Sequence, residues 1–268
     1  MSLKKVLVTG ATGQIGNAVF MRLKEQPEKY DVYALDRSAT FSARVPKSWV
    51  LDIPKERLYL CDMTDMEGLR RAVQDMDVVV HLAADITHNW ESILNSNIIG
   101  AYNAFEACRQ AGVGRVIVGS SITVSDGYTE EEPYKAIHEK RYEDVPADFP
   151  KVTPNIPAKP MNLYSSSKVW WESLARTYSH EYGMSCIAIR IGQVERDRPR
   201  PPQGASIFVS VRDIVQIFEL CINADDSLRF DIFYGMSNND WRWVDIEHAR
   251  DELGFEPQDR AEDNWTYD

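Results

Sequence analysis

The segment TGATGQIG constrains the fold more than any other part of this sequence, because it places Gly10, Gly13 and Gly16 directly after the apolar run KVLV. Glycine permits a tight turn and lets a ligand approach the backbone closely. Residues 14–26 follow with apolar side chains at helical spacing, so we expect a strand, a turn and a helix. The free N–H groups of such a helix end suit a pyrophosphate, although a glycine triplet by itself fits an ordinary turn equally well.

The alternation of short apolar runs and amphipathic segments continues as far as residue 192. We expect further strands at 31–36, 57–62, 77–84, 115–121 and 184–192, and helices at 64–75, 90–112 and 163–183. This order predicts an α/β fold, a doubly wound parallel sheet of the Rossmann type covered by helices on both faces. Ligands of such sheets bind at the carboxyl ends of the strands.

Two regions break this rhythm. Residues 126–160 are rich in proline and charge and are too long for an ordinary connection, so we expect a lid-like insertion in a nucleotide-binding domain that spans 1–192. Residues 193–268 add short elements, including a strand at 229–235. We expect this tail to form a small substrate-side cap that is not an independent domain.

Composition narrows the classes of partner. The chain of 268 residues carries a net charge of -11 at pH 7, which would repel the phosphates of a nucleic acid. Its apolar runs are too short to cross a bilayer, and its amino terminus shows no signal-peptide core. The five histidines do not pair at metal-ligand spacing, and the four dispersed cysteines indicate reduced thiols. We therefore expect a cytoplasmic protein without nucleic-acid, membrane or metal partners.

Acidic residues end the second and third expected strands. Asp36 lies 20 residues after Gly16, where a carboxylate accepts hydrogen bonds from the hydroxyls of an adenine ribose. Its charge would repel a 2'-phosphate and so favours NAD, whereas Arg37 beside it suits a phosphate and leaves NADP open. Asp62, together with Met63, is placed to meet the adenine. The alternative is that Asp62 only caps the following helix.

A tyrosine and a lysine four positions apart begin the expected helix at 163–183. Tyr164 and Lys168 share one helix face because of this spacing. A phenol has a pKa of about 10 and is a poor base near neutrality, but a neighbouring ammonium lowers that pKa. Taken alone, the pair also fits an ordinary surface helix, and Trp170 and Trp171 indicate that part of this helix is buried in the core or in a dimer.

In this order the motifs resemble those of the extended short-chain dehydrogenases/reductases, the NAD-dependent epimerase/dehydratase group. The resemblance rests on TGATGQIG, Asp36, HLAA at 81–84, NIIGAYNAFEA at 97–107, the serines at 120–121 and YSSSK at 164–168. It implies hydride chemistry on an alcohol, with NAD as the cofactor. It also implies a homodimer formed through the helices at 90–112 and 163–183.

The resemblance further implies a set of site residues. Ser121 matches the catalytic serine, Tyr164 the base, Lys168 its partner, and Asn97 the asparagine associated with a proton-relay water. The implied cofactor-binding residues are Gly10, Thr12, Gly13, Gln14, Ile15, Gly16, Asp36, Arg37, Asp62, Met63, Leu82, Ala83, Ala84, Tyr164 and Lys168. The implied substrate-binding residues are Ser121, Ile122, Thr123 and Arg190, the last of which matches an arginine that binds a substrate carboxylate.

Within the group, the short tail after Gly192 is similar to that of uronate dehydrogenases and of the short-chain type of glucose-6-phosphate dehydrogenase. This similarity implies oxidation of a pyranose sugar at its anomeric carbon to a lactone, with a uronate, an aldose or a sugar phosphate as the substrate. SSIT at 120–123 departs from the SSNH of those relatives and leaves the sugar unassigned. The first alternative is a sugar or nucleotide-sugar epimerase or dehydratase with tightly bound NAD, and the second is a dinucleotide-sensing regulator.

Two loops are candidates to cover the sugar. The insertion offers Tyr134, His138 and Lys159 for this purpose. Three arginines at 196–200 follow the expected strand at 184–192, at the end of the sheet where a substrate should lie. Such arginines suit a carboxylate or phosphate, but they also suit pairing with the acids among them, and both interpretations stay open.

Overall fold

Seven parallel strands form one sheet in the order β3-β2-β1-β4-β5-β6-β9, as the computed structural model of residues 3–87, 89–194 and 204–263 shows. The strands are β1 Lys4–Thr9, β2 Tyr30–Asp36, β3 Leu58–Leu60, β4 Val78–His81, β5 Arg115–Ser121, β6 Ser185–Ile191 and β9 Phe230–Gly235. The predicted doubly wound sheet is confirmed, and its order reverses between β1 and β4. Ligands of this fold bind at such a reversal.

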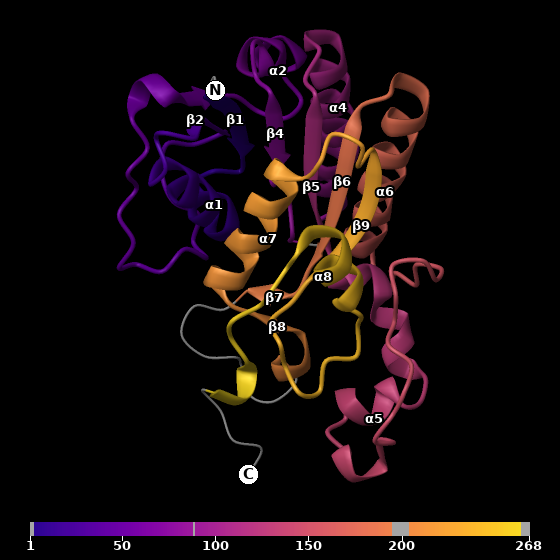
Figure 1. Cartoon of the computed structure of the whole chain (residues 1–268). Helices are drawn as coiled ribbons and strands as arrows, with labels where there is room; N and C mark the ends of the chain where they lie inside the picture. Colours follow the sequence, from indigo (N-terminus) through magenta and orange to yellow (C-terminus); the bar gives the residue numbers. More distant parts are fainter. Residues whose placement is uncertain (1–2, 88, 195–203, 264–268) are drawn as a thin grey trace.

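Helices cover both faces of the sheet (Figure 1). One face carries α1 Gln14–Lys24, α7 Val211–Asn223 and α8 Glu247–Leu253, and the other carries α2 Met66–Val73, α4 Gly100–Ala111 and α6 Leu163–Tyr182. Strand β1 shows why both faces are apolar. Val6 and Val8 join the core under α1 and α7, while Leu7 joins the core under α4 and α6. Alternate residues of a strand point to opposite faces, so a doubly covered strand must be apolar throughout.

The helix predicted at 90–112 is not one regular α-helix. It begins as α3 Trp90–Ile93, continues as a π-helical segment Leu94–Ile99, and ends as α4. A π-helical turn inserts an extra residue into the helix and often occurs at functional sites. Asn97 lies inside this segment and is fully buried.

The strand predicted at 229–235 belongs to the main sheet, not to the cap. β9 pairs in parallel with β6, from Cys186 opposite Phe230 to Ile191 opposite Gly235. The tail therefore supplies the last strand of the nucleotide-binding sheet, together with α7 on one of its faces. Two short strands, β7 Gln193–Val194 and β8 Phe208–Val209, pair separately.

The insertion and the carboxyl-terminal segment form one packed unit. Val152 N donates to Trp243 O at 2.9 Å, and Asp245 N donates to Val152 O at 3.0 Å. Short helices of the described residues include α5 Tyr134–His138 and the 3-10 helices Lys55–Arg57, Ile122–Glu130, Tyr142–Asp144, Ala205–Ile207 and Ala261–Asp263. The core that the two segments share contains Ile122, Tyr128, Tyr134, Ile137, Val152, Tyr234, Met236, Trp243, Val244 and Ile246. The insertion is thus anchored by apolar packing.

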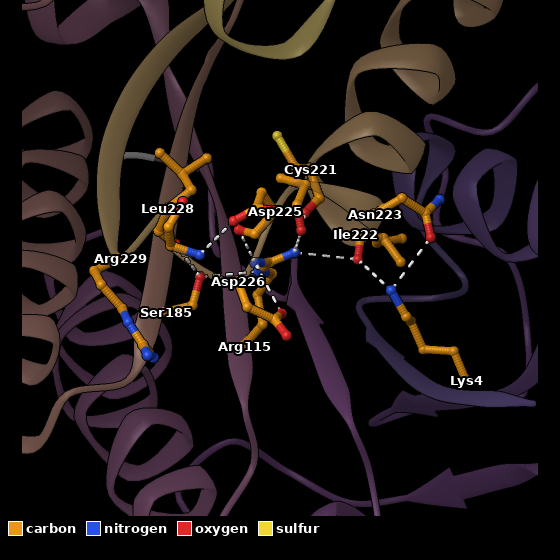
Figure 2. Close-up of polar contacts among 12 residues, drawn as sticks. Lys4, Arg115, Ser185, Cys221, Ile222, Asn223, Asp225, Asp226, Leu228 and Arg229 are labelled. Carbon is orange, nitrogen blue, oxygen red and sulfur yellow. Dashed lines mark hydrogen bonds and ion pairs between the residues drawn. The ribbon is translucent and has the colours of Figure 1, made fainter. Parts of the chain in front are cut away.

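A buried arginine joins the amino end of β5 to the end of α7. The Arg115 guanidinium donates to the carbonyl oxygens of Cys221, Ile222, Ala224 and Asp225 at 2.7 to 3.3 Å, and to Ser185 Oγ at 2.9 Å. Figure 2 shows this cluster, in which Lys4 also donates to Ile222 O at 2.9 Å. Cations suit the carbonyl end of a helix, so the cluster holds α7 against the sheet.

None of the helices in the described ranges is both long enough and apolar enough to cross a membrane. Within the same ranges, no three His, Cys, Asp or Glu side chains are grouped in a way that would hold a metal ion. The four cysteines are buried free thiols.

Candidate active site

The glycine turn is shaped by close backbone packing. Gly10 has a φ of 69°, and a Cβ there would lie 2.8 Å from Ala83 N. A Cβ at Gly16 would lie 2.1 Å from Gly10 O, so a side chain at either position would force the turn apart. Gly13 precedes α1, and no side chain of the described residues caps that helix. The exposed N–H groups at the start of α1, at Gln14 and Ile15, therefore fit a pyrophosphate.

The Asp36 carboxylate lies against this turn. Its Oδ2 accepts a hydrogen bond from Thr12 N at 2.9 Å, and its Oδ1 accepts one from Arg37 N at 2.8 Å. Each carboxylate oxygen has a second lone pair, so Asp36 can also accept ribose hydroxyls. The structure brings Asp36 and the glycine turn together as the sequence predicted.

Asp62 lies near the same edge but does not cap α2. Its Oδ1 accepts from Thr64 N at 2.9 Å and from Thr64 Oγ1 at 2.7 Å, and Asp65 is the residue that caps α2. These Thr64 hydrogen bonds lower the pKa of Asp62, and the Arg37 charge adds to the effect. The alternative interpretation of Asp62 as the helix cap is therefore wrong. Met63 is buried, and its carbonyl accepts from Asn103 Nδ2 at 3.0 Å.

The segment after β4 is held beside the glycine turn by Thr9. Leu82 N and Ala83 N both donate to Thr9 Oγ1 at 3.1 Å, and Leu82 and Ala83 pack partly buried on opposite faces of the sheet. Ala84 packs beside Ala83. His81, the first residue of the HLAA motif, is fully buried, and its Nδ1 lies 2.9 Å from the same hydroxyl.

Ser121 and Tyr164 meet at the carboxyl end of β5. Ser121 Oγ accepts from Thr123 N at 3.2 Å and from Thr123 Oγ1 at 2.9 Å, which leaves the Ser121 proton for the Tyr164 phenol. Burial raises the pKa of Tyr164, and the Ser121 hydrogen bond and the Arg44 charge partly oppose this increase. Arg44 was missed because it lies 120 positions from Tyr164, in a loop that Ser42 N ties to Thr12 O at 3.1 Å.

Lys168 lies near Tyr164, and its effect on the Tyr164 phenol stays a prediction. Its ammonium is buried, lies 5.7 Å from the centroid of the Tyr164 ring and donates to Gly119 O at 2.8 Å. Burial lowers the pKa of Lys168. The ammonium lies 3.3 Å from the centroid of the Trp171 ring.

Asn97 is occupied by protein partners. Its Oδ1 accepts from Asp85 N at 2.7 Å, and its Nδ2 donates to Asp85 O at 2.8 Å and to Ser167 Oγ at 2.9 Å. Its backbone carbonyl accepts from Trp171 Nε1 at 2.7 Å. Asn97 thus joins the loop after β4 to α6, and its part in a proton relay stays a prediction.

Arg190, expected to bind a substrate carboxylate, already has an internal one. Its Nε and one terminal nitrogen each donate to Glu172 at 2.9 Å, and the other donates to Tyr234 OH at 2.9 Å. Burial by itself lowers the pKa of Arg190, but the hydrogen bonds and charge of Glu172 raise it overall. Ser120 Oγ also donates to Glu172 at 2.6 Å. Arg190 is therefore held by an internal ion pair, and its contact with a substrate carboxylate stays a prediction.

Other expected substrate contacts are also used inside the protein. Ile122 is buried in the core that the insertion shares with the carboxyl-terminal segment, and Thr123 orients Ser121. Tyr134 donates to Pro150 O at 2.9 Å, while Lys159 pairs with Glu131. His138 is exposed. Arg196, Arg198 and Arg200 lie outside the described residues.

Comparisons with known proteins agree with this geometry. Residues 6–216 match the model of the NAD dependent epimerase/dehydratase family. The NAD-dependent glucose-6-phosphate dehydrogenase of Haloferax volcanii is 32% identical over 96% of this chain and 94% of its own length. The uronate dehydrogenase of Agrobacterium fabrum is 31% identical over 97% of this chain and 86% of its own length. A crystal structure of a mutant uronate dehydrogenase from Agrobacterium tumefaciens complexed with NAD, 29% identical, aligns with a TM-score of 0.76 over 98% of this chain and 87% of that one.

Proposed function

This chain belongs to the NAD dependent epimerase/dehydratase family, and we propose that it oxidises a pyranose sugar at its anomeric carbon to a lactone, with NAD as the acceptor. The observation that carries the proposal is the meeting of Ser121 and Tyr164 at the sheet edge that also holds the glycine turn. The dehydrogenases of sugars among its relatives support it, since they align with this chain over nearly its whole length.

The cofactor is held by the first half of the sheet in this proposal. The backbone from Gly10 to Gly16 receives the pyrophosphate, and Asp36 accepts the ribose hydroxyls. The Asp36 charge disfavours a 2'-phosphate, so we propose NAD in preference to NADP. NAD, when bound, supplies the acceptor for the hydride that leaves the anomeric carbon.

The protein supplies the proton acceptor. Tyr164 takes the proton of the anomeric hydroxyl, while the Ser121 hydroxyl, oriented by Thr123, holds the substrate oxygen. The carbon loses a hydride and the oxygen a proton, so a C=O bond forms and a lactone is released. Since burial raises the pKa of Tyr164, the base form grows with pH, and the rate should rise toward alkaline pH.

A screen of substrates tests this function. The purified protein is mixed with uronates, neutral aldoses or aldose 6-phosphates and with NAD or NADP, and reduced cofactor is followed by its absorbance. We expect one class of sugar to reduce NAD stoichiometrically and NADP more slowly. Conversion of a sugar to its epimer, or loss of water from it, without release of reduced cofactor would replace this proposal by the epimerase or dehydratase. Binding of NAD without any turnover would favour a regulator.

We also propose that the protein is a homodimer that pairs through α4 and α6. Tyr102, Trp170 and Tyr182 on these helices are 47%, 37% and 50% exposed, and with neighbouring side chains they line a hollow of about 360 Å³. Aromatic side chains gathered on one face are typical of an interface. Light scattering should give a dimer for the wild type and a monomer for Tyr102→Glu. The matched control is Leu60→Glu at an exposed position of β3, and it should remain a dimer.

A cytoplasmic location belongs to the same proposal. All four cysteines are free thiols, which is typical of a reducing compartment. Cell fractionation with an antibody against the protein tests it, and recovery from an exported fraction would contradict it.

A further inference from the structure

Two adjacent tryptophans of α6 bond to consecutive carbonyls of the π-helical segment Leu94–Ile99. Trp170 Nε1 donates to Ile98 O at 3.2 Å, and Trp171 Nε1 donates to Asn97 O at 2.7 Å. A π-helical turn changes the regular pairing of a helix, so carbonyls near its end are open to donors from side chains. Both indoles therefore donate a hydrogen bond to a backbone carbonyl of the π-helical segment.

Their surroundings differ. Trp170 is 37% exposed, whereas Trp171 is fully buried. The Lys168 ammonium lies 3.3 Å from the centroid of the Trp171 ring, and the His81 ring stacks on Trp171 with centroids 4.3 Å apart and planes 24° apart. Among the described residues, Trp171 is thus the side chain that contacts Lys168, His81 and Asn97 together.

Lys168 depends on this ring because its other described partner is uncharged. Its ammonium donates one hydrogen bond in the described structure, to Gly119 O at 2.8 Å. Glu172, one helical turn further along α6, is occupied by Arg190 and Ser120. A buried ammonium without a counter-charge is costly, and the face of an indole is the most favourable aromatic surface for a cation.

His81 adds no second charge to this stack. Thr9 Oγ1 already accepts from two backbone N–H groups, so its own proton points to His81 Nδ1. The His81 ring is then neutral with its proton on Nε2. Burial and the Lys168 charge lower the pKa of His81 to about 3, so this state persists over the pH range of an enzyme assay.

We infer that Trp171 is a positioning residue for the sugar oxidation proposed above: its ring holds the Lys168 ammonium in the charged form, and its N–H anchors the ring to the π-helical segment that carries Asn97. The inference rests on the proposed function only for its link to catalysis. The geometry of Lys168 and Trp171 can be tested without turnover.

The direct test is a titration of Lys168 in the free protein. Protein labelled with ¹³C-lysine is followed by NMR against pH, and the Lys168 signal is identified by its absence from Lys168→Arg. Among the described residues, the titratable groups to account for are Tyr164 and Glu172 on its own helix and His81 on β4. We expect the Lys168 midpoint to fall by about one pH unit in Trp171→Met, because the cation loses its aromatic partner. Trp171→Phe, which keeps an aromatic face, should shift it by about half as much.

Trp170→Phe is the matched control. It removes an indole bond to the neighbouring carbonyl but no contact with Lys168, so its midpoint should equal that of the wild type. Equal midpoints in wild type, Trp171→Phe and Trp171→Met would overturn the inference, as would an upward shift. If Trp171→Met does not fold, the comparison of Trp171→Phe with wild type decides.

The second readout is the pH profile of turnover. The pH of half-maximal kcat should rise in Trp171→Met, because loss of the Lys168 charge near Tyr164 disfavours the phenolate. Trp170→Phe should keep the wild-type profile. If the wild type oxidises no sugar, the proposed function fails, and the NMR titration still decides the role of Trp171. If the wild type is active but its profile does not move in Trp171→Met, the positioning role is wrong.

Discussion

Two buried cations with very different partners lie at the two ends of β5, Arg115 on the strand itself and Lys168 on α6. At the amino end, Arg115 donates to four carbonyl oxygens and a serine hydroxyl (Figure 2). Near the carboxyl end, Lys168 donates one hydrogen bond among the described residues and rests on an aromatic ring. Both side chains are almost fully buried, at 5% and 2% exposure.

We therefore expect the amino end of β5 to matter for stability and its carboxyl end to matter for catalysis. A guanidinium whose donors are used by the protein has none left for a ligand, so Arg115 holds α7 on the sheet. An ammonium with unused donors can bind a ligand beside Tyr164 and Ser121. Arg190 lies at the carboxyl end of β6 but resembles Arg115, because Glu172 and Tyr234 use its donors.

The largest expected effect is at the carboxyl end. Tyr164→Phe should lower kcat about 1,000-fold or more, because the substrate hydroxyl loses its proton acceptor. The dissociation constant for NAD, measured by calorimetry, should change by less than about twofold, since the phenyl ring remains. The control is Tyr182→Phe at an exposed position of the same helix, and it should turn over normally. Turnover of Tyr164→Phe near the wild-type rate would contradict the assignment of the base.

At the amino end the expected effect is on folding. Arg115→Met should lower the free energy of unfolding by about 3 kcal/mol, because several carbonyls at the end of α7 lose their donor. Urea denaturation measures this change, and kcat of the folded enzyme should stay within about twofold of wild type. Arg229→Met at an exposed position should cost about 0.5 kcal/mol. A loss of turnover in Arg115→Met without a loss of stability would reverse the comparison.

The Arg190 and Glu172 pair, like Arg115 at the amino end of β5, should affect the stability of the fold. Arg190→Met leaves a buried carboxylate unpaired and should lower the free energy of unfolding by about 3 kcal/mol. The double variant with Glu172→Gln and Arg190→Met should lose less than the sum of the two single variants. The double-mutant cycle is measured by denaturation. In parallel, KM is measured with an anionic and a neutral sugar. A rise in KM confined to the anionic sugar would support the predicted contact between Arg190 and a substrate carboxylate.

The acid response of His81 tests a buried, uncharged group at the carboxyl end of β4. Its pKa is lowered to about 3 in the folded state, below the ordinary value of 6.5, so the unfolded state takes up the proton first. The His81 contribution to stability is therefore complete above about pH 6.5 and is lost as the pH falls toward 3, at up to about 1.4 kcal/mol per pH unit. Denaturation at several pH values should show a shallower loss in His81→Gln. The exposed His180→Gln should keep the wild-type slope.

Much of the fold could be predicted because its signals are local. The glycines at 10, 13 and 16 and the apolar runs around them indicated the strand, turn and helix that the structure contains. Strand β9 was assigned to the cap because nothing in residues 229–235 states which strand they pair with. The π-helical segment was missed because its sequence keeps the spacing of a regular helix.

The candidate site was predictable where residues carry family motifs and not where partners are distant. Asp36 lies against the glycine turn as expected. The partners of Arg44, His81, Glu172 and Trp171 could not be predicted. Their contacts join residues far apart in the chain or depend on side-chain orientation. The internal partner of Arg190 also gave no signal, because Glu172 lies on another element of the fold.

The sequence by itself determined the doubly wound sheet and the glycine turn, because hydrophobic period and glycine geometry act over short distances. Only the tertiary structure decided which charged side chains have internal partners. It paired Arg190 with Glu172, saturated Arg115 with carbonyls and left Lys168 on the Trp171 ring. Burial makes a cation take whatever partner packs beside it, and that partner is set by the fold and not by spacing in the chain.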